Sequence, residues 1–168
     1  MSSAPPRRLL GIDLGERRIG LALRDGSTAP RGLPTMMRRL TPAADSERLR
    51  TIVAEGHVTE LVVGLPLHSD GRLSPQATAT LHWATEVGWA LQLPVTFVDE
   101  RYSSQRAEAS LGRAPRGSNG SAPGPARREA RRAAVDREAA RLILEDALNP
   151  ELLIDPTTLK VDLRESAR

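Results

Sequence analysis

The first third of the chain carries short apolar runs separated by tight turns. Residues 9–14 and 19–23 each form an apolar run of strand length, with a short polar turn between them. The segment 28–37 fits an edge strand, because Pro30 and Pro34 cannot donate to a sheet ladder. This spacing predicts an antiparallel meander of three strands.

Helical and strand patterns alternate in the rest of the chain. Thr41 and Ser74 are each followed by proline, which is typical of a helix cap with proline in the first turn. A later helix would be capped by Ser103 or Ser104. We expect helices over 41–56, 74–93, 103–111 and 126–148, and strands over 60–65 and 95–98. This order predicts an α/β fold with a mixed central sheet, in which a three-strand antiparallel meander is joined to parallel strands and flanked by helices.

A Gly-, Pro- and Ser-rich stretch interrupts this pattern at 112–126. Such a composition predicts a mobile loop, here lying within a domain and not dividing it. The length of 168 residues suits one domain. We therefore assign 9–148 to that domain, 1–8 to a flexible N-terminus and 149–168 to a C-terminal tail without a predicted element.

The composition excludes several classes of protein. The chain has no cysteine, which rules out disulfides, thiolate zinc sites and thiol catalysis. Aromatic residues make up only 2%, so base stacking should not dominate any nucleic-acid contact. The segment 1–8 is too short and polar for a signal peptide, and no apolar run reaches the roughly 18 residues of a membrane span. We expect a cytoplasmic protein with no membrane partner.

Arginine dominates the basic residues. The net charge is only +3, which by itself does not indicate a polyanionic partner. Lys160 is the one lysine, and many arginines are paired, as in Arg17-Arg18 and Arg131-Arg132. Arginine binds phosphate through a planar, two-pronged guanidinium. Two explanations stay open, a coding bias toward arginine and a phosphate-binding surface.

Three acidic residues lie where acids are costly. Asp13 interrupts the first apolar strand, and Glu100 follows the strand at 95–98. Asp136 falls on the apolar face of the last predicted helix. A carboxylate in such a place must be paired, protonated or bound to metal. Together the three suit divalent cations, Mg²⁺ or Mn²⁺, that catalyse attack of water on a phosphodiester.

Each acid also has a simpler explanation. Asp13 could cap the turn at Gly15. Asp99 and Glu100 could pair with Arg101 at the surface. Asp136 could pair with Arg132, four residues earlier on the same helix.

Four segments resemble one known family. DLGERRIGLAL, VVGLPLHSDGRLSP, VDERYSS and AVDREAARLIL occur in that order between residues 9 and 148. They resemble the YqgF (RuvX) family of ribonuclease H-like nucleases, to which Holliday junction resolution and pre-16S ribosomal RNA processing are attributed. The resemblance implies a ribonuclease H-like fold, with Asp13, Glu100 and Asp136 as catalytic, metal-binding residues.

The resemblance also implies residues around the acids. Nucleic acid would be contacted by Arg17, Arg18, Arg101, Ser103, Arg131 and Arg132, with Arg18 and Arg101 as either substrate or structural partners. A loop near the site would be shaped by Gly15, Gly64, Pro66, Asp70 and Gly71.

The sequence departs from the family pattern at two places. His68 stands where many relatives have asparagine. A basic residue, often lysine, precedes the last aspartate in relatives, and here Arg131 and Arg132 are the nearest candidates. Arginine does not donate a proton as lysine does, which puts an acid role at this position in doubt.

Several functions are compatible with these residues. We favour RNA processing, the maturation of the pre-16S rRNA 5′ end in ribosome biogenesis, over Holliday junction resolution in DNA repair. Junction resolution needs a symmetric dimer, and no apolar dimer stripe stands out. A catalytically silent nucleic-acid-binding module is a further alternative, and a kinase-like ATPase is disfavoured because its fold needs two such domains. The protein would be a monomer or homodimer.

Overall fold

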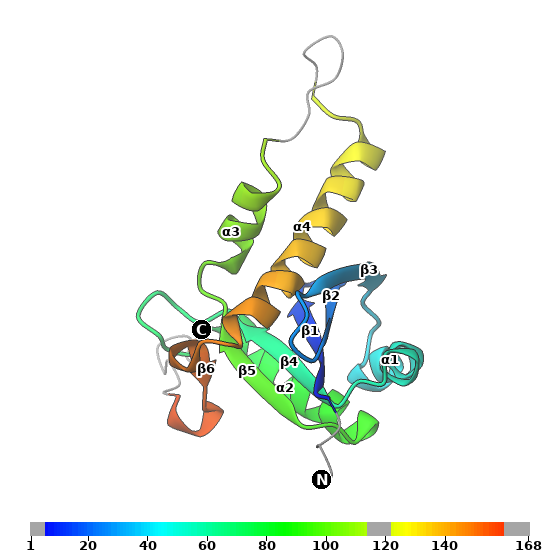
Figure 1. The fold of residues 1–168 in the computed structure, drawn as a ribbon. Helices are drawn as coiled ribbons and strands as arrows, with labels where there is room; N and C mark the ends of the chain where they lie inside the picture. The colour runs from blue at the N-terminus through cyan, green and yellow to red at the C-terminus, as the bar shows by residue number, and fades with distance from the viewer. Residues whose placement is uncertain (1–5, 114–121, 160–168) are drawn as a thin grey trace.

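The computed structural model describes residues 6–113 and 122–159, and their core is one mixed sheet (Figure 1). Its spatial order is β3-β2-β1-β4-β5-β6. The strands are β1 (Arg8–Leu14), β2 (Arg18–Asp25), β3 (Arg31–Met37), β4 (Glu60–Leu65), β5 (Val95–Asp99) and β6 (Leu153–Ile154).

The strand directions confirm the predicted α/β architecture. β1, β2 and β3 form an antiparallel meander, and β4 and β5 run parallel to β1. β6 pairs antiparallel to β5, with Val98 opposite Leu153. The carboxyl ends of β1, β4 and β5 therefore meet at the same edge of the sheet.

Two of the four α-helices in the described residues, the first and the second, begin at the predicted caps. The four helices are α1 (Pro42–Gly56), α2 (Pro75–Leu91), α3 (Ser103–Ser110) and α4 (Pro125–Asp146). Thr41 Oγ1 accepts a hydrogen bond from the Ala44 amide, and Ser74 Oγ accepts one from the Ala77 amide. Both helices thus satisfy an N-terminal donor that would otherwise lack a partner.

The expected cap of α3 is wrong. Tyr102 occupies the N-cap position and makes no side-chain cap hydrogen bond. Ser103 lies inside the helix, and its hydroxyl donates instead to Glu100 Oε1 at 2.8 Å. A hydrogen bond from a hydroxyl to a carboxylate is stronger than one between neutral groups at a helix cap. The contact with Glu100 therefore overrides the local capping signal.

Two apolar layers enclose the sheet. One face packs against α1 and α2 through a large cluster that includes Leu49 and Trp83. Trp83 is buried, and its indole Nε1 donates to Asp45 Oδ2 at 2.9 Å, which joins the two helices. The other face packs against α4, where Ile143 and Leu144 are fully buried.

Helix α4 lies unusually close to the sheet. A Cβ added at Gly11 would come within 2.7 Å of the Ala140 carbonyl oxygen, and one added at Gly20 would overlap the Asp136 carbonyl oxygen. Gly20 is also the cross-strand partner of Asp13. Because Gly11 and Gly20 have no side chain, α4 can lie this close to β1 and β2. These two glycines therefore determine the position of Asp136.

The structure adds elements beyond the C-terminal end of the predicted domain. The tail left unassigned at 149–168 contributes β6 and two short 3-10 helices, Pro150–Leu152 and Pro156–Thr158. Most of the predicted loop at 112–126 lies outside the described residues, as do most of the predicted N-terminal segment and the end of the tail. None of the helices in the described part of the chain is long and apolar enough to span a membrane.

Gly20→Ala should destabilise the fold because the new methyl group meets helix backbone, which cannot move aside as a flexible side chain can. We expect a loss of about 2–3 kcal/mol in the free energy of unfolding, measured by urea denaturation. Gly124→Ala is the matched control, since a Cβ there meets nothing within 4 Å. An equal loss in both variants would contradict the proposed role of the close approach.

Candidate active site

Three acidic residues from separate elements line one cavity of about 320 Å³. Asp13 comes from β1, Glu100 follows β5, and Asp136 comes from α4. The cavity lies at the carboxyl ends of the parallel strands, where their side chains converge. Its remaining lining residues are Leu14, Gly15, Pro66, Leu67, Gln76, Arg101, Tyr102 and Gln105.

Asp13 and Glu100 are in direct contact. Asp13 donates a hydrogen bond to Glu100, and Glu100 accepts a second one from Ser103 Oγ. Gly64, on the strand between β1 and β5, makes this contact possible: a Cβ there would overlap Glu100 Oε2 and lie 2.7 Å from Ile143 Cδ1. The predicted loop-shaping glycine thus provides the space in which the Glu100 carboxylate lies.

Burial and mutual repulsion favour the protonated forms of these two carboxyl groups. Burial raises the pKa of Asp13 well above its ordinary value, and the neighbouring charges of Glu100 and Asp136 raise it further. Burial also raises the pKa of Glu100, although the hydrogen bonds from Asp13 and Ser103 partly offset this effect. The hydrogen bond between them raises the pKa of Asp13 and lowers that of Glu100, so Asp13 is the member of the pair that binds a proton more tightly.

Asp136 is held by an arginine of the first motif. Arg18 Nε lies 2.6 Å from Asp136 Oδ2, and Arg18 Nη1 lies 2.9 Å from Glu129 Oε1. The two acidic residues lie two turns apart on α4, so Arg18 fastens β2 to this helix. The hydrogen bond with Asp136 has the largest effect on the pKa of Arg18, and it raises that pKa.

The simpler explanations for the acids can now be compared with the geometry. The Gly15 turn is closed by its own amide, which donates to the Arg18 carbonyl at 2.9 Å, while Asp13 contacts Glu100. Asp99, and not Glu100, pairs with Arg101, at 2.6 Å. Asp136 does pair with an arginine, but with Arg18 of β2 where the sequence suggested Arg132.

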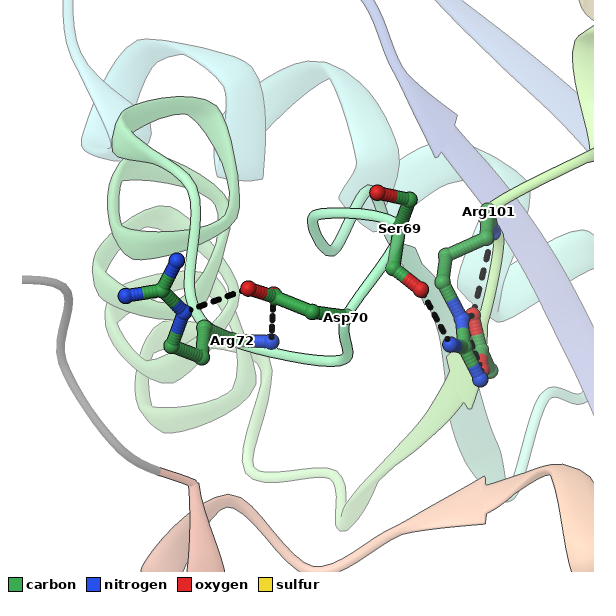
Figure 2. A network of polar contacts seen from close by, with 5 residues as sticks. Ser69, Asp70, Arg72 and Arg101 are labelled. Carbon is green, nitrogen blue, oxygen red and sulfur yellow. Dashed lines mark hydrogen bonds and ion pairs between the residues drawn. The ribbon is translucent and has the colours of Figure 1, made fainter.

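The segment between β4 and α2 forms one wall of the site. The Ser69 carbonyl accepts from Arg101 Nη1 at 3.1 Å, and Asp70 accepts from the Arg72 amide and Nε, as Figure 2 shows. These contacts with Arg72 lower the pKa of Asp70. Gly71 adopts a φ of 83°, which favours glycine. At the start of this segment, the Pro66 carbonyl accepts from Ser74 Oγ at 2.6 Å.

Arg101 connects this wall to the strand that precedes the site. Its guanidinium pairs with Asp99 and reaches the Ser69 carbonyl (Figure 2). Asp99 holds the pKa of Arg101 above its ordinary value. Of the two roles expected for Arg101, the structural one is the one its contacts support.

The other residues expected to bind nucleic acid fall into two groups. Arg17 and Arg132 are exposed, and Arg131 donates to the carbonyls of Leu111 and Gly112 at the end of α3. Ser103 is only 2% exposed and is bonded to Glu100. Burial leaves its hydroxyl no surface for nucleic acid, so we now expect it to orient Glu100.

Sequence reasoning missed four polar residues at the site. Gln76 lies in the first turn of α2, and Tyr102 and Gln105 lie at the start of α3. Glu129 is the second partner of Arg18. A signal existed for three of them: Gln76 and Gln105 each follow directly on a segment that resembles the family, and Tyr102 lies within one.

The donor set fits a hard divalent cation. Carboxylate oxygens are the ligands preferred by Mg²⁺ and Mn²⁺, and a buried carboxyl pair that must otherwise retain a proton favours a positive charge beside it. Among the described residues, no three acidic or histidine side chains are already arranged to hold a metal ion. Asp136, the third of the acids that line the cavity, is paired with Arg18.

Comparison with known proteins gives one consistent answer. The family model "RuvX: Holliday junction resolvase" matches residues 7–150. A protein of Synechococcus sp., named "Putative pre-16S rRNA nuclease", is 42% identical over 84% of this chain and 89% of its own length. A protein of the same name from Roseiflexus sp. is 34% identical over 89% of this chain and 99% of its own.

A solved structure shares the fold. The structure of T. thermophilus RuvC in complex with Holliday junction substrate aligns with a TM-score of 0.52 at 15% identity. The alignment covers 88% of this chain and 99% of the RuvC chain. At this identity the similarity establishes the common ribonuclease H-like architecture and not the substrate.

The raised pKa values of Asp13 and Glu100 predict that the stability of the fold depends on pH. A carboxyl group whose pKa is raised on folding contributes most to the free energy of unfolding below about pH 4, where it is protonated in both states. This contribution is lost as the pH rises through the pKa of the folded state. With a chelator present, Asp13→Asn should therefore be more stable than the unaltered protein at about pH 8, with a smaller difference at about pH 5. Urea midpoints at both pH values measure this, and a difference independent of pH would contradict the raised pKa of Asp13.

Proposed function

Because the chain belongs to the RuvX family of Holliday junction resolvases, we propose that it is a nuclease that hydrolyses nucleic-acid phosphodiester bonds with divalent metal ions. The proposal depends on one observation: Asp13, Glu100 and Asp136 come from three elements and line one cavity. Binding modules have no need of a buried like-charged pair, which lowers stability unless a cation joins it.

We assign the following tasks to the residues of the cavity. Asp13 and Glu100 would hold the cation between them, with Ser103 fixing the orientation of Glu100. Asp136 would complete the donor set after exchanging its contact with Arg18. When bound, two divalent ions would supply an activated water and stabilise the leaving oxygen. The preferred ion, Mg²⁺ or Mn²⁺, is left to experiment.

None of the described residues is a lysine, so no described side chain can donate a proton as lysine does in relatives. Arg18 and Arg101 are the basic residues close to the acids, and both are engaged with carboxylates. A guanidinium keeps its proton at neutral pH, so these residues stabilise charge and do not act as acids.

We propose RNA processing, the maturation of the pre-16S rRNA 5′ end, as the physiological role. Relatives that match most of this chain are named for that activity. Resolution of Holliday junctions is the second candidate, favoured by the description of the family. A cytoplasmic location and a monomeric or homodimeric state remain predictions.

Removal of one carboxylate should abolish cleavage. Asp13→Asn, Glu100→Gln and Asp136→Asn should each lower the rate on labelled RNA by at least about a hundredfold, the loss typical of removing one charge-stabilising group. Activity of the unaltered protein should require added Mg²⁺ or Mn²⁺ and disappear with a chelator. Glu86→Gln is the control, since Glu86 lies on α2 outside the cavity and pairs with His82.

Equal cleavage by Asp13→Asn, or full activity in chelator, would reject the proposed chemistry. Circular dichroism of each variant should match the unaltered protein, so that a loss of rate is not a loss of fold.

A parallel digest should separate the two physiological roles. Precursor ribosomal RNA, single-stranded DNA and a four-way DNA junction are offered at equal concentration. We expect the highest kcat/KM on the RNA precursor, with cleavage at the mature 5′ end. Symmetric paired cuts in the junction at a higher kcat/KM would instead establish the junction as substrate.

A further inference from the structure

A second groove lies next to the acidic cavity, on the other part of helix α3. It has a volume of about 680 Å³ and lies between α3 and the first turns of α4. These two helices lie side by side and project beyond the sheet as an arm (Figure 1). The residues that line the groove are Gln105, Glu108, Ala109, Gly112, Arg113 and Arg131.

The groove and the cavity share one lining residue. Gln105 lines both of them, and Tyr102, at the start of α3, lines the cavity. Since α3 begins three residues after Glu100, its axis leads away from the acids. Its eight residues span about 12 Å, which corresponds to about three or four nucleotides of one strand.

Positive charge gathers at the far end of the groove. Arg113 is exposed there, and Arg131 is fixed beside it by donating to the carbonyls of Leu111 and Gly112. Glu108 is the one carboxylate among the lining residues. Fixed guanidinium groups bind phosphate oxygens well, because less side-chain entropy is lost on binding.

The lining chemistry also indicates what part of a nucleic acid would be bound. None of the residues that line the groove is aromatic, so there is no platform for stacking bases. Contacts would fall on the phosphate backbone, which fixes register and orientation without reading sequence.

We infer that this groove binds the strand that leaves the active site, with Arg113 and Arg131 contacting its phosphates about three or four nucleotides from the cut. This inference rests on the proposed nuclease function. It adds a binding track that makes the arm part of substrate recognition.

A comparison of two substrate lengths tests the track. The short strand has a single nucleotide on each side of the scissile phosphate. The long strand extends by about eight nucleotides on each side, which is more than the groove spans. Arg113→Glu should raise KM on the long strand at least about fivefold and leave KM on the short strand unchanged. Arg127→Glu is the control, since Arg127 is an exposed residue of α4 outside the groove and the change of net charge is the same.

The outcomes separate the two proposals. If the unaltered protein cuts both strands and Arg113→Glu changes KM equally on both, or not at all, the track is overturned and the nuclease function stands. An equal effect of Arg127→Glu also overturns it, because general charge would then explain the loss. Failure of the unaltered protein to cut either strand overturns both proposals.

A cross-link provides a second measurement. The chain has no cysteine, so a single one introduced at Ala109 can carry a photoreactive group without background. Ala109→Cys should cross-link the long strand about three or four nucleotides from the cleavage site, within the span of α3. Ala43→Cys, exposed on α1, should give at least about tenfold less product. Equal cross-linking from both positions would overturn the track.

Discussion

The seating of α4 on the sheet is the constraint on which the site depends. The helix approaches β1 and β2 so closely that its backbone meets Gly11 and Gly20 and not side chains. Because Gly20 lies opposite Asp13, the same approach brings Asp136 beside the other two acids. The second apolar core and the cluster of three acids are therefore products of a single packing interaction.

The acids illustrate how a site can oppose the stability of its own fold. Asp13 and Glu100 are half-buried beside each other, where burial raises the pKa of both, and protonation of Asp13 removes part of their repulsion. Arg18 performs a similar task for Asp136 from a different strand. A raised carboxyl pKa on one side of the cavity and a guanidinium on the other thus limit the repulsion among the three acids.

The order of elements could be predicted because its signals are local. Thr41 and Ser74 mark helix starts within a few residues of themselves, and apolar periodicity marks the strands. The partner of Asp136 could not, since Arg18 lies 118 positions away and only the fold brings it near. The two-residue β6 was missed for another reason: it is too short to show any periodicity. The three acids themselves were predictable as an apolar context broken by charge.

The two borders of the sheet are protected by different means. On one side β6 pairs with Phe97 and Val98 of β5, so a strand of another molecule cannot pair at those positions. On the other side Pro34 interrupts the donors of β3. Unprotected borders invite strand-by-strand stacking of one molecule on the next. A short C-terminal segment and one proline thereby make the protein poorly suited to amyloid-like assembly.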